Sequence, residues 1–476
     1  MYFFYRILTA VGMLVLAPYY ALRGWRRGEP ARTLRERFGW VDAELAARAE
    51  ACAKEAAASG GCRPGAIWIH AVSVGEVLAA APLVVALKKR FPSRCVFVST
   101  TTETGQRLAR ERLAQADGVF YFPLDWVVAV RRAMRTVRPA LAIVMETEIW
   151  PNFLREARRA GVPVIFANAR ISTRSFARFK RWEWLIGPFF ARAMRDADLF
   201  LAQTPEDAAR LVAMGAPSNE GEERVRVTGN LKYDAEPPRA GKFCEWLGAE
   251  IQRQERWPVL VAGSVVAEEE QAVLAAYDVA QRRWRHALLI LAPRKPDRFD
   301  AAAAIAAEGG WNVVRRSQVG LSSEVAPELA SKLDESADVL VLDSIGELAA
   351  LYGLADAAFV GGSLVPSGGH NILEPAWFGK PPVFGPSMEN FREMAAQFLS
   401  AQAGVQVNSG EHLGRVWVQL IENEALRKKT GNAARALAER NRGATARVIE
   451  RVTALLQDET QAADRSHAST AFRGSQ

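Results

Sequence analysis

The sequence predicts an α/β protein with two doubly wound parallel sheets of similar size, preceded by an apolar segment at the N-terminus. Three observations lead to this fold class. Short apolar runs alternate with amphipathic segments, which is the pattern of successive βαβ units. A stretch rich in Pro, Gly and charge over residues 233–257 divides these runs into two series. The 476 residues are enough for two or three domains of ordinary size.

The N-terminal apolar segment covers residues 2–22, with Arg6 as its only charge. About 20 such residues can cross a bilayer as a helix, so we assign residues 1–22 as a membrane anchor. Six arginines follow between residues 23 and 37, and such an excess marks the cytoplasmic side of a span. One alternative is a cleaved signal peptide. A closer one is a helix lying in the membrane interface, because Arg6 and Pro18 interrupt the apolar run.

The composition excludes several classes of protein. A mean hydropathy of −0.05 excludes a polytopic membrane protein. The net charge of +8 is better explained by a membrane surface than by nucleic acid, because the arginines cluster beside the anchor. Four widely spaced cysteines form no CxxC pair or disulfide framework, which indicates a reducing compartment. Five histidines show no zinc-binding spacing.

The elements follow in two series. A basic juxtamembrane segment with an Ala-rich helix at about 42–58 occupies residues 23–65. The first domain spans residues 66–232, with strands expected at 66–70, 95–100, 118–122, 141–145, 162–167 and 199–203. Residues 233–257 form a linker.

The second domain spans residues 258–457, with strands expected at 259–263, 287–292, 312–314, 339–342, 357–361 and 382–385. Helices at 410–424, 424–440 and 444–457 complete it. Residues 458–476 form a polar tail that we expect to be disordered. Two such domains predict a ligand cleft at the carboxyl ends of their strands.

Glu76 follows the first strand and lies at the beginning of a helix. It comes three residues after Ser73, the spacing of a capping box, so the carboxylate could serve only as a helix cap. At the carboxyl end of a strand it could instead accept a proton from a sugar hydroxyl. Because a helix N-terminus favours the ionised form, we expect a carboxylate that is ready at neutral pH but only weakly basic.

Two further clusters lie in the first domain. Glu146 and Glu148 end a buried apolar strand, either as site residues or as buried salt-bridge partners of Arg170 or Lys232. Lys232 itself lies where the first domain closes, and it is either a site cation or a solvated surface lysine.

The second domain has a Gly-rich run over residues 361–375. A helix is expected to begin near His370 and Asn371, where backbone N–H groups suit a phosphate. Glu374, one turn further on, could bind the two hydroxyls of a ribose, and Arg294 can neutralise a phosphate. The combination is typical of nucleotide-sugar binding.

Together these clusters resemble the family of 3-deoxy-D-manno-octulosonic acid (Kdo) transferases that act on lipid A precursors. The most specific parts are residues 73–76, 146–152 and 361–375, with further matches at 168–172 and 229–232. The resemblance implies a GT-B fold of two Rossmann-like domains with an N-terminal anchor at the cell inner membrane and catalytic domains on the cytoplasmic face. It implies transfer of Kdo from CMP-Kdo to lipid IV-A in lipopolysaccharide biosynthesis, with inversion, without a cofactor and without a metal at the transfer centre.

The resemblance also assigns roles to residues. Glu76 is the general base, and Glu146 and Lys232 stabilise the transition state. The contacts with CMP-Kdo fall on Pro293, Arg294, Ile345, Gly346, Glu347, Asn371, Ile372, Leu373 and Glu374. The sequence departs from the family after Ser264, where the family often has a His and a Gly before a Glu and this sequence has Val265-Val266-Ala267, although Glu269 is in place. The expected partners are CMP-Kdo, lipid IV-A and anionic lipids of the membrane surface, and not nucleic acid.

Two alternatives remain at this stage. Another GT-B transferase or an epimerase that uses a UDP-sugar fits the two sheet series but fits the anchor and the Glu76/Glu146 pair less well. A membrane-tethered nucleotide-binding protein without catalysis predicts binding without turnover, which disagrees with the several charges at strand ends.

Overall fold

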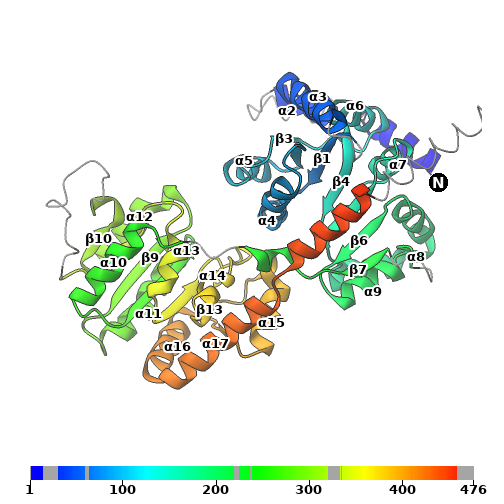
Figure 1. The fold of residues 1–476 in the computed structure, drawn as a ribbon. Coiled ribbons are helices and arrows are strands. Elements are labelled where there is room, and N and C mark those ends of the chain that lie inside the picture. Colours follow the sequence, from blue (N-terminus) through cyan, green and yellow to red (C-terminus); the bar gives the residue numbers. More distant parts are fainter. Residues whose placement is uncertain are drawn as a thin grey trace, which may run out of the picture. The chain divides into compact units, whose positions relative to one another are not determined.

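A computed structural model of the chain describes residues 2–13, 31–58, 64–218, 224–235, 239–319, 333 and 335–457. The chain forms two compact units, each with one parallel sheet of seven strands (Figure 1). Unit 1 contains the residues up to Ala235 together with those from Asn441 onward, and unit 2 contains residues 236–440. The prediction of two doubly wound α/β domains is therefore confirmed.

The strands of unit 1 are β1 (Ala66–His70), β2 (Val96–Thr100), β3 (Gly118–Tyr121), β4 (Pro139–Met145), β5 (Val164–Ala169), β6 (Leu199–Ala202) and β7 (Val225–Val227). Its helices are the N-terminal helix (residues 2–13), α2 (Ala31–Arg37), α3 (Ala43–Ala58), α4 (Val74–Arg90), α5 (Glu103–Arg112), α6 (Val127–Val137), α7 (Pro151–Arg159), α8 (Thr173–Met194), α9 (Pro205–Ala213), the 3-10 turn η1 (Leu231–Asp234) and a helix over residues 444–457.

The sheet of unit 1 has the strand order β3-β2-β1-β4-β5-β6-β7. Successive residues of β1 enter different cores, because side chains alternate along a strand. Trp68 packs against Phe153 on one face, with ring centroids 5.3 Å apart. Ile67 and Ile69 join the core on the other face, which contains Val448. Burial on both faces explains why these strands are continuous apolar runs in the sequence.

The strands of unit 2 are β8 (Val259–Val265), β9 (Leu288–Pro293), β10 (Val313–Arg315), β11 (Val339–Val341), β12 (Ala357–Val360), β13 (Pro382–Phe384) and β14 (Val405–Gln406). Its helices are α10 (Lys242–Arg253), α11 (Glu270–Gln281), α12 (Phe299–Glu308), α13 (Leu348–Leu351), α14 (Leu373–Trp377), α15 (Arg392–Ser400), α16 (Gly410–Glu422) and α17 (Glu424–Arg440), and its short 3-10 turns are η2 (Pro296–Arg298), η3 (Arg316–Gln318), η5 (Tyr352–Leu354) and η6 (Glu389–Phe391). The sheet order is β10-β11-β9-β8-β12-β13-β14.

The structure adds two strands that the sequence did not predict, β7 and β14. Both are edge strands of two or three residues and are partly exposed. Neither has the apolar run that marks a buried strand, so the sequence carries no signal for them.

The helix over residues 444–457 belongs to unit 1, so the predicted end of the second domain at residue 457 is too late. Ala444, Val448, Val452 and Leu456 are spaced four residues apart and are fully buried. They pack in the same core as Ile67 and Ile69 of β1. The spacing predicted a helix, but an apolar stripe does not tell which of two sheets it covers.

The N-terminal region is described only in part. The predicted anchor extends beyond the described helix over residues 2–13, and the predicted tail at 458–476 lies outside the described residues. Within the described parts of the chain, every helix is either too short or too polar to span a bilayer.

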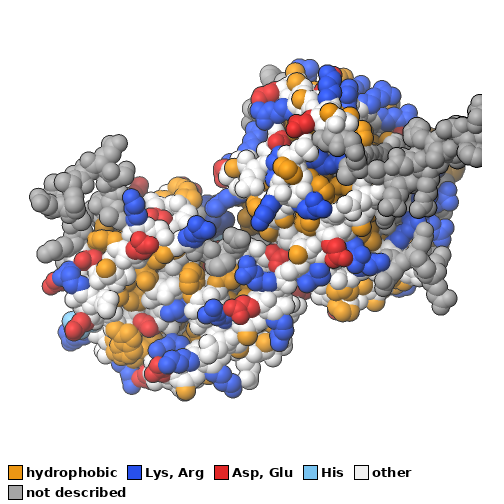
Figure 2. Space-filling view, viewed as in Figure 1, with side chains coloured by type: hydrophobic (Ala, Val, Ile, Leu, Met, Phe, Trp, Pro, Cys, Tyr) orange, Lys and Arg blue, Asp and Glu red, His pale blue; other side chains and the backbone are white. Residues whose placement is uncertain are grey.

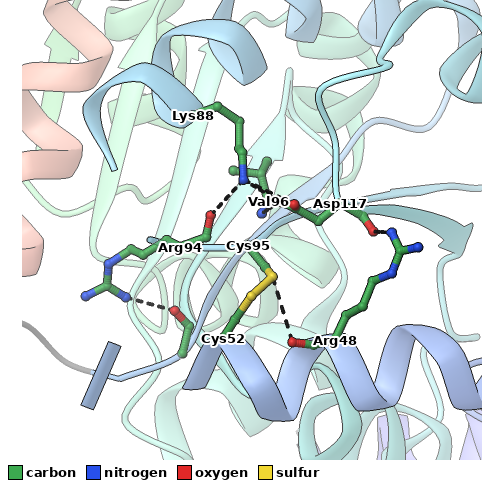
Figure 3. The surroundings of a disulfide bond; sticks show 8 residues. Arg48, Cys52, Lys88, Arg94, Cys95, Val96 and Asp117 are labelled. Carbon is green, nitrogen blue, oxygen red and sulfur yellow. Dashed lines mark hydrogen bonds and ion pairs between the residues drawn. A yellow bond between two sulfur atoms is a disulfide. The ribbon is translucent and has the colours of Figure 1, made fainter. Parts of the chain in front are cut away.

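Cys52 of α3 and Cys95, next to β2, form a disulfide with their Cα atoms 5.9 Å apart (Figure 3). The prediction that the cysteines form no disulfide is wrong for this pair. The two residues are 43 positions apart, and they meet because α3 packs in the same core as β2. Beside them, Lys88 Nζ lies 2.9 Å from Asp117, which accepts a hydrogen bond from Val96 N and so fixes the beginning of β2.

The C-terminal helix should stabilise unit 1 and not unit 2. Leu456→Ala removes a fully buried side chain, which should lower the free energy of unfolding of unit 1 by about 2–5 kcal/mol. Leu420→Ala in α16 is the matched control in unit 2. Hydrogen exchange followed by peptide should show faster exchange in β1 and β4 for Leu456→Ala and in β8 and β9 for Leu420→Ala. Faster exchange in unit 2 for Leu456→Ala would contradict this assignment.

Candidate active site

The sheet of unit 1 changes direction between β1 and β4. Strands before this point are added on one side of β1, and later strands are added on the other side of β4. Such a switch point leaves a crevice at the carboxyl ends of the two strands, where ligands of open α/β sheets bind. Glu76 follows β1 and Glu146 follows β4, so the structure places both predicted residues at this point.

The carboxylate of Glu76 is held by two donors. Its Oε2 accepts a hydrogen bond from Val72 N at 2.8 Å, and its Oε1 accepts one from Ser73 Oγ at 2.8 Å. In a capping box the serine oxygen would accept from the helix and the glutamate would accept from the serine N–H. Ser73 makes no such side-chain cap, so Glu76 does not take part in an ordinary capping box.

Glu76 is only 5% exposed. Burial and the negative charge of Glu146 raise its pKa to about 8, against the effect of the two hydrogen bonds. The expectation of an ionised carboxylate at neutral pH is therefore wrong, because desolvation outweighs the helix N-terminus. At pH 7 the group is mostly protonated, and once deprotonated it is a stronger base than an ordinary glutamate.

Glu146 has a left-handed backbone conformation, with φ of 53°. Its N–H donates to Ala167 O at 2.8 Å, which keeps the end of β4 joined to β5. A non-glycine residue in this region is uncommon and often marks a functional site. Burial and the charge of Glu146 also raise the pKa of Glu148, so three carboxyl groups influence one another here.

Lys232 joins this group from η1. Two asparagines hold its backbone: Asn168 Oδ1 accepts from Leu231 N and Asn230 Oδ1 accepts from Lys232 N, each at 3.0 Å. Its Nζ lies 3.8 Å from the position that a Cβ on Gly75 would occupy, so the ammonium lies against the first turn of α4. The structure thus brings Glu76, Glu146 and Lys232 to one edge of unit 1.

Asn168 was not predicted as a site residue by itself, only as part of the matching segment 168–172. It is fully buried, has φ of 57° and is the penultimate residue of β5, which pairs with β4, the strand that Glu146 follows. Asparagine is one of the few residues that adopt the left-handed conformation, so an asparagine near the end of a strand could have indicated a special role. Its partner Leu231 lies 63 residues away and could not be predicted from the sequence.

In unit 2 the switch point lies between β8 and β12, and Glu269 organises the Gly-rich loop there. This fully buried carboxylate accepts hydrogen bonds from Gly362 N at 2.6 Å, from Ser363 N and Leu364 N at 2.8 Å, and from Val266 N at 3.1 Å. The first amides of the loop are therefore occupied by the protein itself. Val266, one of the residues that depart from the family pattern, supplies one of these four N–H donors.

The helix expected near His370 begins later, as the five-residue α14 at Leu373. Asn371 Oδ1 accepts from Leu373 N at 3.2 Å, and Glu374 lies in the first turn, as predicted. Burial and the charge of Arg294 lower the pKa of His370 to about 4. Arg294 follows Pro293 at the end of β9. Because its charge affects the pKa of His370, Arg294 lies close to the segment that precedes α14.

The predicted residues 345–347 precede α13, which contacts α14. Ile345 is 70% exposed, and Gly346 has φ of 95°, which favours glycine. Glu347 pairs with Arg316, whose Nε and Nη2 lie 3.0 and 3.1 Å from its oxygens. Its carboxylate is engaged within the protein, so Glu347 is better suited to shape the loop than to bind a ligand directly.

The described residues contain no group of three or more His, Cys, Asp or Glu side chains placed to hold a metal ion.

Residues 32–235 match a family model described as "3-Deoxy-D-manno-octulosonic-acid transferase (kdotransferase)". A 3-deoxy-D-manno-octulosonic acid transferase of Haemophilus influenzae is 33% identical over 389 residues, which cover 81% of this chain and 86% of that protein.

Two solved structures are also similar. The C-terminal CMP-Kdo binding domain of WaaA from Acinetobacter baumannii is 29% identical and covers 41% of this chain and 97% of its own, with a TM-score of 0.37. UDP-GlcNAc 2-epimerase from Neisseria meningitidis is 14% identical and covers 81% of this chain and 99% of its own, with a TM-score of 0.50. The epimerase shares the fold alone.

The two doubly wound domains, with carboxylates and a lysine gathered at one switch point, define an α/β protein with a GT-B-like fold. Within this class, the chain belongs to the 3-deoxy-D-manno-octulosonic acid transferases, and it is a glycosyltransferase. The predicted family is confirmed, and the non-catalytic alternative is set aside.

The role of Glu269 can be tested with its neighbour as control. In Glu269→Gln the side-chain NH2 would face backbone N–H donors, so the variant should lose at least one charge-assisted bond, worth about 1.5–3 kcal/mol. Glu268→Gln removes an exposed carboxylate and should change stability by less than about 0.5 kcal/mol. Denaturant unfolding of both variants measures the difference. Equal stability would show that Glu269 does not hold the loop.

Proposed function

We propose that this enzyme transfers Kdo from CMP-Kdo to a glucosamine hydroxyl of lipid IV-A, with inversion at the transferred sugar. The observation that carries the proposal is the buried carboxyl of Glu76, with its pKa raised to about 8, beside Glu146 and Lys232 at the switch point of unit 1. A base of this strength is suited to accept a proton from a sugar hydroxyl near neutral pH. Family membership supports a Kdo donor and a lipid acceptor.

Unit 2 supplies the proposed binding site for CMP-Kdo. Glu269 already occupies the amides of Gly362, Ser363 and Leu364, so we infer that a phosphate binds further along, at Asn371 and Ile372, next to Leu373, whose N–H donates to Asn371 Oδ1. Arg294 is exposed beside this segment and can neutralise the phosphate. Pro293, Ile345 and Gly346 shape the neighbouring loops, with Glu347 held in place by Arg316. Glu374 is proposed to bind the ribose.

The reaction follows from these groups. The acceptor oxygen attacks the anomeric carbon of Kdo while its proton passes to Glu76. The bond between that carbon and the phosphate oxygen breaks, and CMP leaves with the electron pair. Positive charge develops on the sugar, where Glu146 stabilises it, and negative charge develops on the phosphate, where Lys232 and Arg294 can stabilise it. Because these cations balance the leaving group, the proposal requires no metal ion at the transfer centre.

We further propose that the enzyme works at the cytoplasmic face of the inner membrane, held there by its N-terminal segment. The apolar run over residues 2–22 and the arginines that follow it support this location. A lipid acceptor supports it as well, because its acyl chains are buried in the bilayer.

Glu76→Gln tests the catalytic proposal. Glutamine keeps the size of the side chain but cannot take a proton, so transfer should fall by about 10²–10⁴-fold. Glu148→Gln changes a neighbouring carboxyl in the same way and should cost less than about tenfold. Mass spectrometry of lipid IV-A incubated with CMP-Kdo generated in situ measures the product. Near wild-type transfer by Glu76→Gln would contradict the assignment of the base.

Arg294→Ala tests the donor site. Loss of one charge-assisted contact with a phosphate should weaken CMP binding by roughly ten- to a hundredfold. Arg285→Ala removes another exposed arginine of unit 2 and should leave the affinity unchanged. Calorimetry with CMP, and with UDP as the competing nucleotide, measures both variants. Equal affinity in the two variants, or tighter binding of UDP, would contradict the proposed donor site.

A further inference from the structure

The turn η1, which carries Lys232, is bound by a part of the chain that lies far away in the sequence. Residues from Asn441 onward return to unit 1 after the whole of unit 2, which ends at Arg440. The helix over residues 444–457 begins there, and in Figure 1 the start of this red helix lies beside the green segment of η1. Contacts on both sides of Lys232 join the two segments.

Asp234, the last residue of η1, binds the beginning of this helix. One oxygen of its carboxylate accepts a hydrogen bond from Gly443 N at 2.6 Å, and the other accepts one from Thr445 N. The first N–H groups of a helix have no partner within the helix, and a negative charge beside them is favourable. The carboxylate therefore ties η1 to the returning chain two residues after Lys232.

Arg447 binds the chain on the other side of Lys232. Its Nε donates to Thr228 O at 2.7 Å, four residues before the lysine. Gly229 makes room for this contact, because a Cβ at this position would lie 2.9 Å from Arg447 Nη2. Lys and Arg side chains are common on the visible surface in Figure 2, so charge alone does not distinguish Arg447. Its hydrogen bond with Thr228 does.

An apolar contact lies between these two polar ones. Leu231 is fully buried, in the core that also contains Ala444 and Val448 of the same helix. The residues next to Lys232 are thus fixed on both sides. Because the backbone is held in this way, the ammonium of Lys232 is directed toward α4, where it lies 3.8 Å from the position of a Cβ on Gly75.

We propose that Asp234 and Arg447 are positioning residues for the transfer reaction, which hold η1 so that the ammonium of Lys232 stays at the switch point of unit 1. The inference rests on the proposed function, in which Lys232 stabilises the leaving phosphate. Electrostatic stabilisation depends on placement, and a displacement of about 1 Å can cost on the order of a hundredfold in rate. A helix cap that served only stability would leave the rate of the folded enzyme unchanged.

The test compares Asp234→Asn with Asp198→Asn. The Asp198 carboxylate also accepts a hydrogen bond from a backbone N–H, that of Val164 at 2.7 Å, but at the amino ends of β5 and β6. In Asp234→Asn an NH2 group would face the N–H donors of the helix and displace η1, so kcat should fall about ten- to a hundredfold. The KM for CMP-Kdo should stay within about twofold, because the lost interaction belongs to the transition state. Asp198→Asn should change neither constant.

A double-mutant cycle separates positioning from stability. In the Lys232→Ala background no ammonium has to be placed, so Asp234→Asn should cost less than about twofold further. Arg447→Gln should follow the same pattern, and Arg451→Gln, one turn further along the same helix, is its control. If Asp234→Asn fails to fold by circular dichroism, the cycle with Arg447→Gln decides. Equal losses in the two backgrounds, or a loss no larger than that of the control, would overturn the proposal.

A measurement without catalysis distinguishes a failure of this inference from a failure of the proposed function. Reductive methylation with a ¹³C label gives each lysine an NMR signal, and the signal of Lys232 is identified by its absence from Lys232→Ala. It should move in Asp234→Asn and stay in place in Asp198→Asn. Near wild-type transfer by Lys232→Ala would contradict the proposed role of the lysine, whereas an unmoved signal in Asp234→Asn would overturn the positioning proposal itself.

Discussion

The burial of neighbouring carboxyl groups at one edge of the first sheet is the constraint on which the account of unit 1 depends. The sheet reverses its direction of growth between β1 and β4, so the residues after these strands must meet. One of them, Glu76, is desolvated and faces the charge of Glu146, which together raise its pKa to about 8. Lys232 then brings a cation against the same turn of α4. These three residues belong to separate segments of the chain. The topology of the sheet is therefore what brings them together at one site.

Unit 2 uses a buried carboxylate for a different purpose. Glu269 binds four backbone N–H groups and so fixes a Gly-rich turn that would otherwise have free amides. A charged acceptor compensates buried donors well, which accounts for its burial. The glycines of this run therefore form the turn and are not themselves the proposed phosphate-binding residues. The proposed N–H donors for the phosphate lie further along the chain, at Asn371 and Ile372.

Most of the fold could be predicted, because strands buried on both faces are continuous apolar runs and parallel order follows from βαβ alternation. The edge strands β7 and β14 and the disulfide of Cys52 with Cys95 could not, since they depend on tertiary neighbours. The meeting of Glu76 and Glu146 could be predicted from their positions after strands, whereas Lys232 was joined to them only by the resemblance to the family. The protonation state of Glu76 could not be predicted. The sequence shows that Glu76 lies at a helix N-terminus, but it does not show that the side chain is buried away from water.

The most direct test of the account is an NMR titration of protein with ¹³C-labelled glutamate carboxyl groups. The account predicts one glutamate that titrates near pH 8, whose signal is absent in Glu76→Gln. In Glu146→Gln the same signal should titrate at lower pH, since the neighbouring negative charge that raises the pKa has been removed. A Glu76 signal that titrates near pH 4–5, the range of an ordinary glutamate, or one that Glu146→Gln does not shift, would contradict the central claim.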